Sequence, residues 1–172
     1  METTSFTGWI HSAFMLGFCP TGKQQNGFIM SQLLSLDPSI QQKIKDLCFE
    51  GYQRYDEADY PQALRLFYQA WLLVPKPQPQ FEEAGWILTA IGDGYFRNKQ
   101  FQQGTEALRS ALKCPKTDRS AFTHLRLGQC LYELGSNEAI EQLSEAFAIG
   151  GEKTFIKEPV KYRHLVKPVA RA

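Results

Sequence analysis

Apolar residues recur at steps of three and four along most of the chain from Asp37 onward, which is the period of helices with one buried face. The first such stretch follows Asp37-Pro38, where an N-cap carboxylate precedes a proline at the first helical position. Its apolar or small side holds Ile40, Ile44, Leu47, Cys48, Gly51 and Tyr55. No part of the chain has the pattern of a strand-rich fold. The sequence therefore predicts an all-α protein.

Short breaks divide this pattern into six helices and a last segment. Prolines 61 and 75 bound the second helix, because proline cannot continue a helix and displaces the residue before it. We expect Thr117-Asp118 to cap the fifth helix and Gly150-Gly151 to close the sixth in a left-handed conformation. The six helices are expected over residues 38–55, 61–74, 80–97, 101–114, 120–134 and 138–149. In the last segment, 158–166, the positions expected to be buried are Val160, Tyr162, Leu165 and Val166.

The six predicted helices fall into three similar pairs. In the first helix of each pair, Gly51, Gly92 and Gly128 lie 41 and 36 residues apart. In the second helices, small residues alternate with large ones as Ala63-x3-Phe67-x2-Ala70, Gly104-x3-Leu108-x2-Ala111 and Ala139-x3-Leu143-x2-Ala146. This arrangement resembles the tetratricopeptide repeat (TPR), in which small residues lie where two helices cross closely.

The resemblance covers about residues 44 to 150 and implies an α-solenoid of three helix-turn-helix repeats, about 44–77, 78–118 and 119–150, within a domain over 37–150. About seven extra residues near 78–84 are expected to lengthen the third helix. Residues 1–36 are expected to be a poorly ordered extension, and our hypothesis places the natural start at Met30. A secretory signal is disfavoured because the stretch before the apolar segment has Glu2 and no basic residue.

Charge is uneven although the net charge is only +1. From Gly150 onward six basic residues stand against two acidic ones, while the chain upstream has 13 basic and 16 acidic residues. We expect residues 151–172 to form a basic segment with a capping helix that covers the open end of the repeat stack. The alternative is that this segment contacts an acidic partner, nucleic acid or anionic lipid.

Composition gives no argument for nucleic-acid or membrane binding, and no apolar run approaches the roughly 20 residues of a membrane span. Four scattered cysteines without a C-x-x-C pair are typical of reduced, buried thiols in a cytosolic protein, so we expect a cytoplasmic location. They are Cys19, Cys48, Cys114 and Cys130.

Catalytic and cofactor motifs are missing. Gly92-Asp93-Gly94 lacks the third glycine and the preceding strand of a dinucleotide loop, and no Walker motif is present. Gly94 is left unexplained by the repeat pattern. The histidines lie in separate elements, and His124 is expected to be a satisfied packing residue. We expect no enzymatic activity, no cofactor and no metal site.

The resemblance implies a concave face lined by the first helix of each pair, where such arrays bind their partners. Aromatic and charged residues at these positions are typical of protein interfaces. The alternative is that several of the rings pack inside the stack or under the end helices. Asp93 disfavours a partner's terminal carboxylate. The expected partner-binding residues are Lys45, Tyr52, Tyr55, Trp86, Asp93, Phe96, Arg97, Gln129, Tyr132 and Glu133.

These features predict a non-catalytic module that binds a protein or peptide partner, and neither nucleic acid nor membrane. The C-terminal string from Gly150 to Leu165 is also similar to the tail of small bacterial TPR proteins encoded beside toxin or secretion systems. That similarity implies a secretion chaperone or an immunity-type protein. The alternative function is structural, namely self-association through the apolar groove to form a homodimer.

Overall fold

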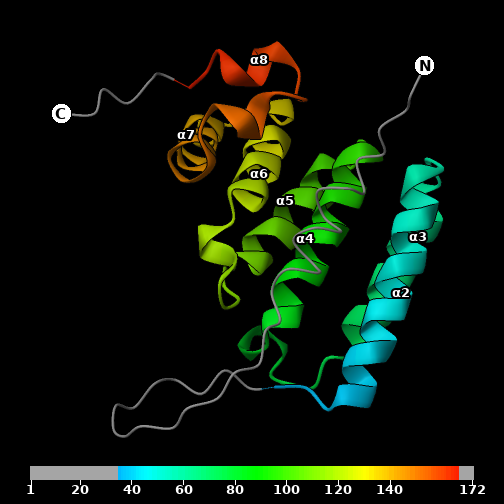
Figure 1. Cartoon of the computed structure of the whole chain (residues 1–172). Coiled ribbons are helices and arrows are strands. Elements are labelled where there is room, and N and C mark those ends of the chain that lie inside the picture. Colours follow the sequence, from blue (N-terminus) through cyan, green and yellow to red (C-terminus); the bar gives the residue numbers. More distant parts are fainter. Residues whose placement is uncertain (1–34, 167–172) are drawn as a thin grey trace, which may run out of the picture.

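The structure is a computed structural model, and it describes residues 35–166. This part of the chain is entirely helical and contains no strand, which confirms the all-α prediction (Figure 1). Its α-helices are α2 (Pro38–Asp56), α3 (Tyr60–Leu73), α4 (Glu82–Arg97), α5 (Phe101–Ala111), α6 (Ala121–Glu133), α7 (Glu138–Gly150) and α8 (Val160–Arg163). Three 3₁₀ turns connect them: η1 (Gln78–Gln80), η2 (Thr117–Arg119) and η3 (Glu152–Phe155).

Most helix ends follow from local chemistry. The Asp37 carboxylate accepts a hydrogen bond from the Ser39 amide at 2.9 Å, as expected for an N-cap. Gly151, at φ 66°, ends α7 in the left-handed conformation that favours glycine. The expected cap at Thr117-Asp118 is wrong. These residues form η2, and the Ser120 hydroxyl caps α6 instead by accepting from the Thr123 amide at 3.2 Å.

Two further expectations about helix lengths are wrong. Only the last of the extra residues near 78–84 belong to α4, which starts at Glu82. The residues before it follow Pro77 and form η1 instead. The fourth helix ends at Ala111 and not at Cys114. The Cys114 amide bonds to the Ala111 carbonyl three residues back, so the chain tightens into a turn there.

Successive helices pack as three pairs, α2 with α3, α4 with α5 and α6 with α7. Each pair has a glycine of its first helix against a large side chain of its second. A Cβ at Gly51 would lie 2.5 Å from the Phe67 ring, one at Gly92 2.4 Å from Leu108, and one at Gly128 2.7 Å from Leu143. These distances are too short for any side chain, so glycine is what lets the two helices of each pair approach.

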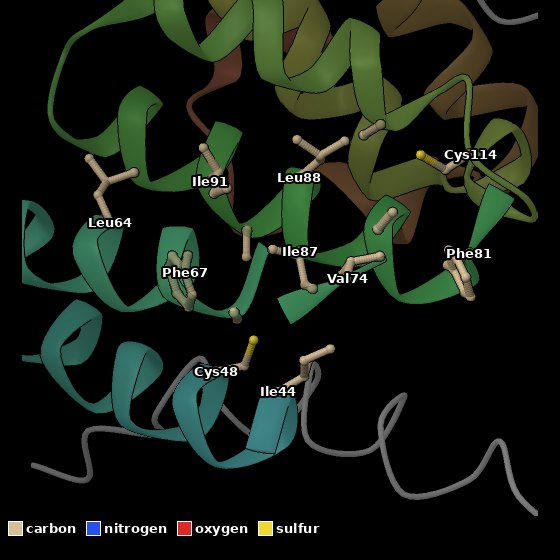
Figure 2. Close-up of a cluster of buried hydrophobic side chains, with 14 of the residues drawn as sticks. Ile44, Cys48, Leu64, Phe67, Val74, Phe81, Ile87, Leu88, Ile91 and Cys114 are labelled. Carbon is tan, nitrogen blue, oxygen red and sulfur yellow. The ribbon is translucent and has the colours of Figure 1, made fainter. Parts of the chain in front are cut away.

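The largest hydrophobic cluster joins the first pair to α4 (Figure 2). Ile44 and Cys48 of α2 meet Phe67 of α3, and Ile87 and Ile91 of α4 cover them from the other side. Two further clusters connect α4 and α5 with α6 and α7. The stack is therefore held by apolar contacts within pairs and between neighbouring pairs.

The segment after α7 packs on the last pair, with η3 against both α6 and α7 (Figure 1). Phe155, Tyr162 and Val166 are buried there, and Leu165 is partly buried. The expected burial of Val160 is wrong, because its side chain points to solvent and is 63% exposed.

Some expectations lie outside the described residues. They concern most of the 1–36 extension, including Met30 and Cys19, and the last residues of the basic tail, 167–172. At the edge of the described part, Leu36 is buried in the first cluster. None of the helices between residues 35 and 166 is both long and apolar enough to cross a membrane.

Candidate functional site

A cluster of polar side chains lies at the centre of the stack, around Arg126 of α6. Arg126 is completely buried, and Asp93 of α4 is only 2% exposed. Charged groups are rarely buried this deeply unless they are paired. We call this cluster the Arg126 network; its members are Tyr55, Asp93, Arg97, Arg126, Gln129 and Glu158.

On one side, the network connects α2, α4 and α6. Asp93 Oδ1 lies 2.6 Å from Arg126 Nε, and Tyr55 Oη of α2 donates a 2.6 Å hydrogen bond to Asp93 Oδ2. Arg97 Nε in turn donates to Tyr55 Oη at 2.9 Å. The Arg126–Asp93 contact is short without having the angle of a hydrogen bond, so it is mainly an attraction between charges.

On the other side, the network reaches the segment after α7. Arg126 Nη1 donates to Gln129 Oε1 at 2.6 Å, and Gln129 Nε2 donates to Glu158 Oε2 at 2.7 Å. Glu158 Oε2 is 3.4 Å from Arg126 Nη1. Arg126 Nη2 has no hydrogen-bond partner within residues 35–166. The Nη1 side of the guanidinium is therefore hydrogen-bonded, while the buried Nη2 is not.

Aromatic rings enclose the same guanidinium. Its central carbon lies 4.7 Å from the centroid of the Phe96 ring and 5.0 Å from that of Phe122. A guanidinium over ring faces is stabilised by the negative potential of those faces, and more strongly where water is excluded. Phe96 and Phe122 thus fix the plane in which Arg126 presents its donors.

The phenol of Tyr55 acts as a donor within this network. Burial raises its pKa well above the usual range, and the negative charge of Asp93 raises it further. The proton therefore stays on Tyr55 at any physiological pH. This phenol is suited to hold the Asp93 carboxylate in place and unsuited to accept a proton from a substrate.

A second polar group lies at the C-terminal end of α6. Tyr162 Oη donates to Glu133 Oε1 at 2.7 Å, and Lys161 Nζ lies 2.5 Å from the same oxygen. Burial alone would raise the pKa of Glu133, but these two hydrogen bonds outweigh it and lower the pKa. The rings of Tyr132 and Tyr162 meet edge to face at 5.5 Å. The segment after α7 therefore contacts Tyr132 and Glu133 as well as Gln129.

The ten predicted partner-binding residues fall into two sets. Tyr55, Asp93 and Gln129 are buried in the Arg126 network and present almost no surface in this conformation. The others keep accessible surface, with Arg97 and Tyr132 classed as exposed and five partly exposed: Lys45, Tyr52, Trp86, Phe96 and Glu133. We call these seven residues the outer set. The alternative, that several of the rings pack inside the stack, applies to Tyr55, whose ring meets those of Tyr52 and Tyr60 edge to face.

Sequence reasoning missed Arg126 and Glu158, the two residues that complete the network. Arg126 lies in an apolar run between Leu125 and Leu127, where a single cation on a packed helix indicates a buried partner. Glu158 lies in a basic segment and gives no signal of its own. Its role depends on the chain returning to α6, which periodicity does not report.

Other reactive groups are occupied by packing. Both ring nitrogens of His124 have a partner at 2.9 Å, Gln142 Oε1 and the Asp118 carbonyl, which confirms the packing interpretation. Cys48, Cys114 and Cys130 are free and buried, as predicted. Burial raises the pKa of the Cys48 and Cys130 thiols to about 12. Within the described part, no three His, Cys, Asp or Glu side chains are placed to hold a metal ion.

No protein-family model matches the chain, and no curated protein matches it either.

Proposed function

We propose that the chain is a TPR-like protein-interaction module that binds a segment of a partner protein and has no catalytic activity. The repeat interpretation is supported by the same glycine-to-large-residue contact in all three pairs. Small residues that let helices cross at a repeated position are what stacking of identical units needs. The observation that supports a binding function is the connection of the first helices of all three pairs through the Arg126 network.

The Arg126 network joins the first helices of the three pairs. Hydrogen bonds and an ion pair run from Tyr55 of α2 through Asp93 of α4 to Arg126 of α6. These bonds connect the three first helices through buried side chains, and in this proposal the accessible sides of the same helices form one binding face. A continuous face built from the first helices of successive pairs is the surface on which helical repeat proteins bind extended or helical segments.

The two sets of residues take different roles in this proposal. Tyr55, Asp93 and Gln129 hold the three helices in register from inside. The outer set supplies the contacts, because Tyr, Trp and Arg bury much area on binding and keep a polar end for orientation. Trp86 and Arg97 lie 11 residues apart on α4, which is close to three helical turns, so they share one side of the helix.

We propose a non-catalytic function because the charged groups of the network are paired with one another. Arg126 and Arg97 offset the charges of Asp93 and Glu158, and the raised pKa of Tyr55 keeps it protonated. Within this class, we propose the narrower role of a secretion chaperone or immunity-type protein on the similarity of the tail.

Affinity capture with mass spectrometry tests the proposal. The full chain, a Trp86→Ala/Arg97→Ala variant and a Leu112→Ala variant serve as baits in lysate of the native host. Leu112 is a partly buried residue just beyond α5, packed against the third cluster, so its truncation controls for lost stability. We expect a partner that the wild type and Leu112→Ala retain and the face variant loses. Equal retention by all three baits would exclude this face.

Light scattering of the same purified chain tests the competing use of the face. A monomer at micromolar concentration leaves the face available for another protein. A stable dimer that the Trp86→Ala/Arg97→Ala variant disrupts would assign the face to a second copy and contradict the proposal.

A further inference from the structure

The segment over residues 152–166, which we call the strap, already occupies part of the proposed binding face. Its Glu158 bonds to Gln129 and approaches Arg126, while Lys161 and Tyr162 bond to Glu133. The Tyr162 ring also contacts the Tyr132 ring. Three residues expected to contact a partner, all on α6, are thus engaged by the chain itself.

The strap pairs with only one of the two terminal nitrogens of Arg126. A guanidinium binds a carboxylate best when two of its nitrogens donate to the two oxygens in parallel. Glu158 instead places a single oxygen, Oε2, 3.4 Å from Nη1, and Nη2 has no hydrogen-bond partner in the described chain. A carboxylate that reached both nitrogens would gain one strong, buried hydrogen bond that Glu158 does not make.

The strap is also closed on itself. Two nitrogens of Arg163 donate to the Glu152 carboxylate. Nε lies 2.8 Å from Oε1 and 2.9 Å from Oε2, and Nη2 lies 2.7 Å from Oε2. Arg163 Nη1 donates to the Val166 carbonyl at 2.9 Å. These bonds connect the two ends of the strap to each other, while the Arg163 guanidinium also lies 4.6 Å from the centroid of the Phe147 ring of α7. The strap can therefore leave the face as a unit without losing its own ion pair.

What holds the strap down is a small number of side chains. Phe155, Tyr162 and Val166 are its buried apolar anchors, and Glu158 is its buried charge. Its outward side is apolar in part, since Ile156 is 75% exposed. A permanent cap of a repeat array normally has a polar outer face. This one does not.

We propose that the strap is an exchangeable internal occupant of the binding face, and that a partner enters by displacing it and placing an acidic side chain on Arg126. This rests on the proposed function. The strap's own contacts describe the partner segment: an acidic residue at the position of Glu158, followed three or four residues later by a lysine or tyrosine that reaches Glu133.

Hydrogen exchange on the full chain tests whether the strap opens. Glu158→Gln removes the buried charge at constant size, and Glu145→Gln, on the exposed side of α7, is the matched control. We expect strap amides of the wild type to exchange faster than those of α6, and Glu158→Gln to accelerate them by about tenfold or more while α2 to α5 stay unchanged. Strap amides that exchange only together with α6, in both proteins, would show a fixed cap and overturn the proposal.

A labelled synthetic peptide of residues 151–166 tests exchange directly, as a stand-in for the partner segment. We expect saturable binding to full-length Glu158→Gln that is about tenfold tighter than to the wild type, because the open fraction sets the apparent affinity. The same peptide with Gln for Glu158 should bind neither. Equal binding to both proteins, or none, would overturn the proposal.

These measurements need no natural partner, so they separate the two proposals. If the strap exchanges but capture finds no partner, the proposed function fails while the opening of the strap stands. If capture succeeds and Glu158→Gln leaves the partner's affinity unchanged, the strap proposal fails alone.

Discussion

Substitution by alanine should have opposite effects on stability at two glycines of α4, Gly92 and Gly94. Both lie inside one helix and both are buried, so Ala brings each the same gain in helix propensity, about 1 kcal/mol. What differs is the space for a methyl group. The comparison therefore isolates packing from propensity.

At position 92 there is no space. The new Cβ would lie 2.4 Å from Leu108 Cγ and 2.8 Å from its Cδ2, and Leu108 is completely buried. Such overpacking destabilises by about 1–3 kcal/mol, which exceeds the propensity gain. At position 94 the nearest atom is Leu64 Cδ2 at 3.0 Å, the end of a flexible side chain. A small shift of that methyl group relieves the contact.

Thermal and urea unfolding of the two variants measure the difference. We expect Gly92→Ala to lose up to about 2 kcal/mol and Gly94→Ala to be neutral or up to about 1 kcal/mol more stable. The gap of about 2 kcal/mol corresponds to about 4–8 °C in melting temperature for a chain of this size. Equal losses at both positions, or a larger loss at 94, would refute the assignment of Gly92 as the crossing point of α4 and α5.

Three further predictions follow from the buried groups. Arg126→Met leaves the Asp93 carboxylate buried without its ion partner and should lower the free energy of unfolding by about 3–5 kcal/mol, measured in urea; a loss below about 1 kcal/mol would contradict the buried pair. Tyr55→Phe removes the donor to the same carboxylate and should lower it by about 1–3 kcal/mol, whereas an unchanged melting temperature would show that this bond is dispensable. Cys48 and Cys130, with pKa values of about 12, should react with a thiol reagent at pH 8 only after unfolding, and fast labelling of the native chain would contradict their burial. Because these thiols lose their protons at lower pH in the unfolded chain than in the folded one, the free energy of unfolding should fall as pH rises from about 9 toward 12.

The helices were predictable because their signals are local. Proline at the start of α2, a capping carboxylate at Asp37 and apolar steps of three and four act within a few residues. The spacing of Gly51, Gly92 and Gly128 was also readable, since a close helix crossing requires a small residue at a fixed position. The errors occurred at helix ends; at the start of α6, for example, Ser120 and not Thr117 is the N-cap.

The candidate site was less predictable, because it depends on contacts distant in sequence. The repeat pattern places Asp93 on the face of the first helices, but it does not report that Arg126 pairs with it there. Nor does it report that the chain returns to α6 and brings Glu158 with it. Burial of Asp93 and Gln129 follows from these contacts. The position of each residue on its helix was available from the sequence; its exposure was not.

Glycine 94 illustrates the same limit. Periodicity left open whether this residue softens α4 or lets a partner's backbone approach. The structure shows Leu64 of α3 over it, so Gly94 belongs to the packing between the first and second pairs. It does not face the proposed partner.

The central claim is that the face of α2, α4 and α6 binds a partner through its accessible residues. The most direct measurement is the dissociation constant of the captured partner for the wild type and for Trp86→Ala/Arg97→Ala, with Leu112→Ala as the stability control. Loss of two interface anchors should weaken binding by about a hundredfold or more, while the control stays near the wild type. A face variant that binds within about threefold of the wild type would contradict the claim, because changes that small correspond to less than 1 kcal/mol.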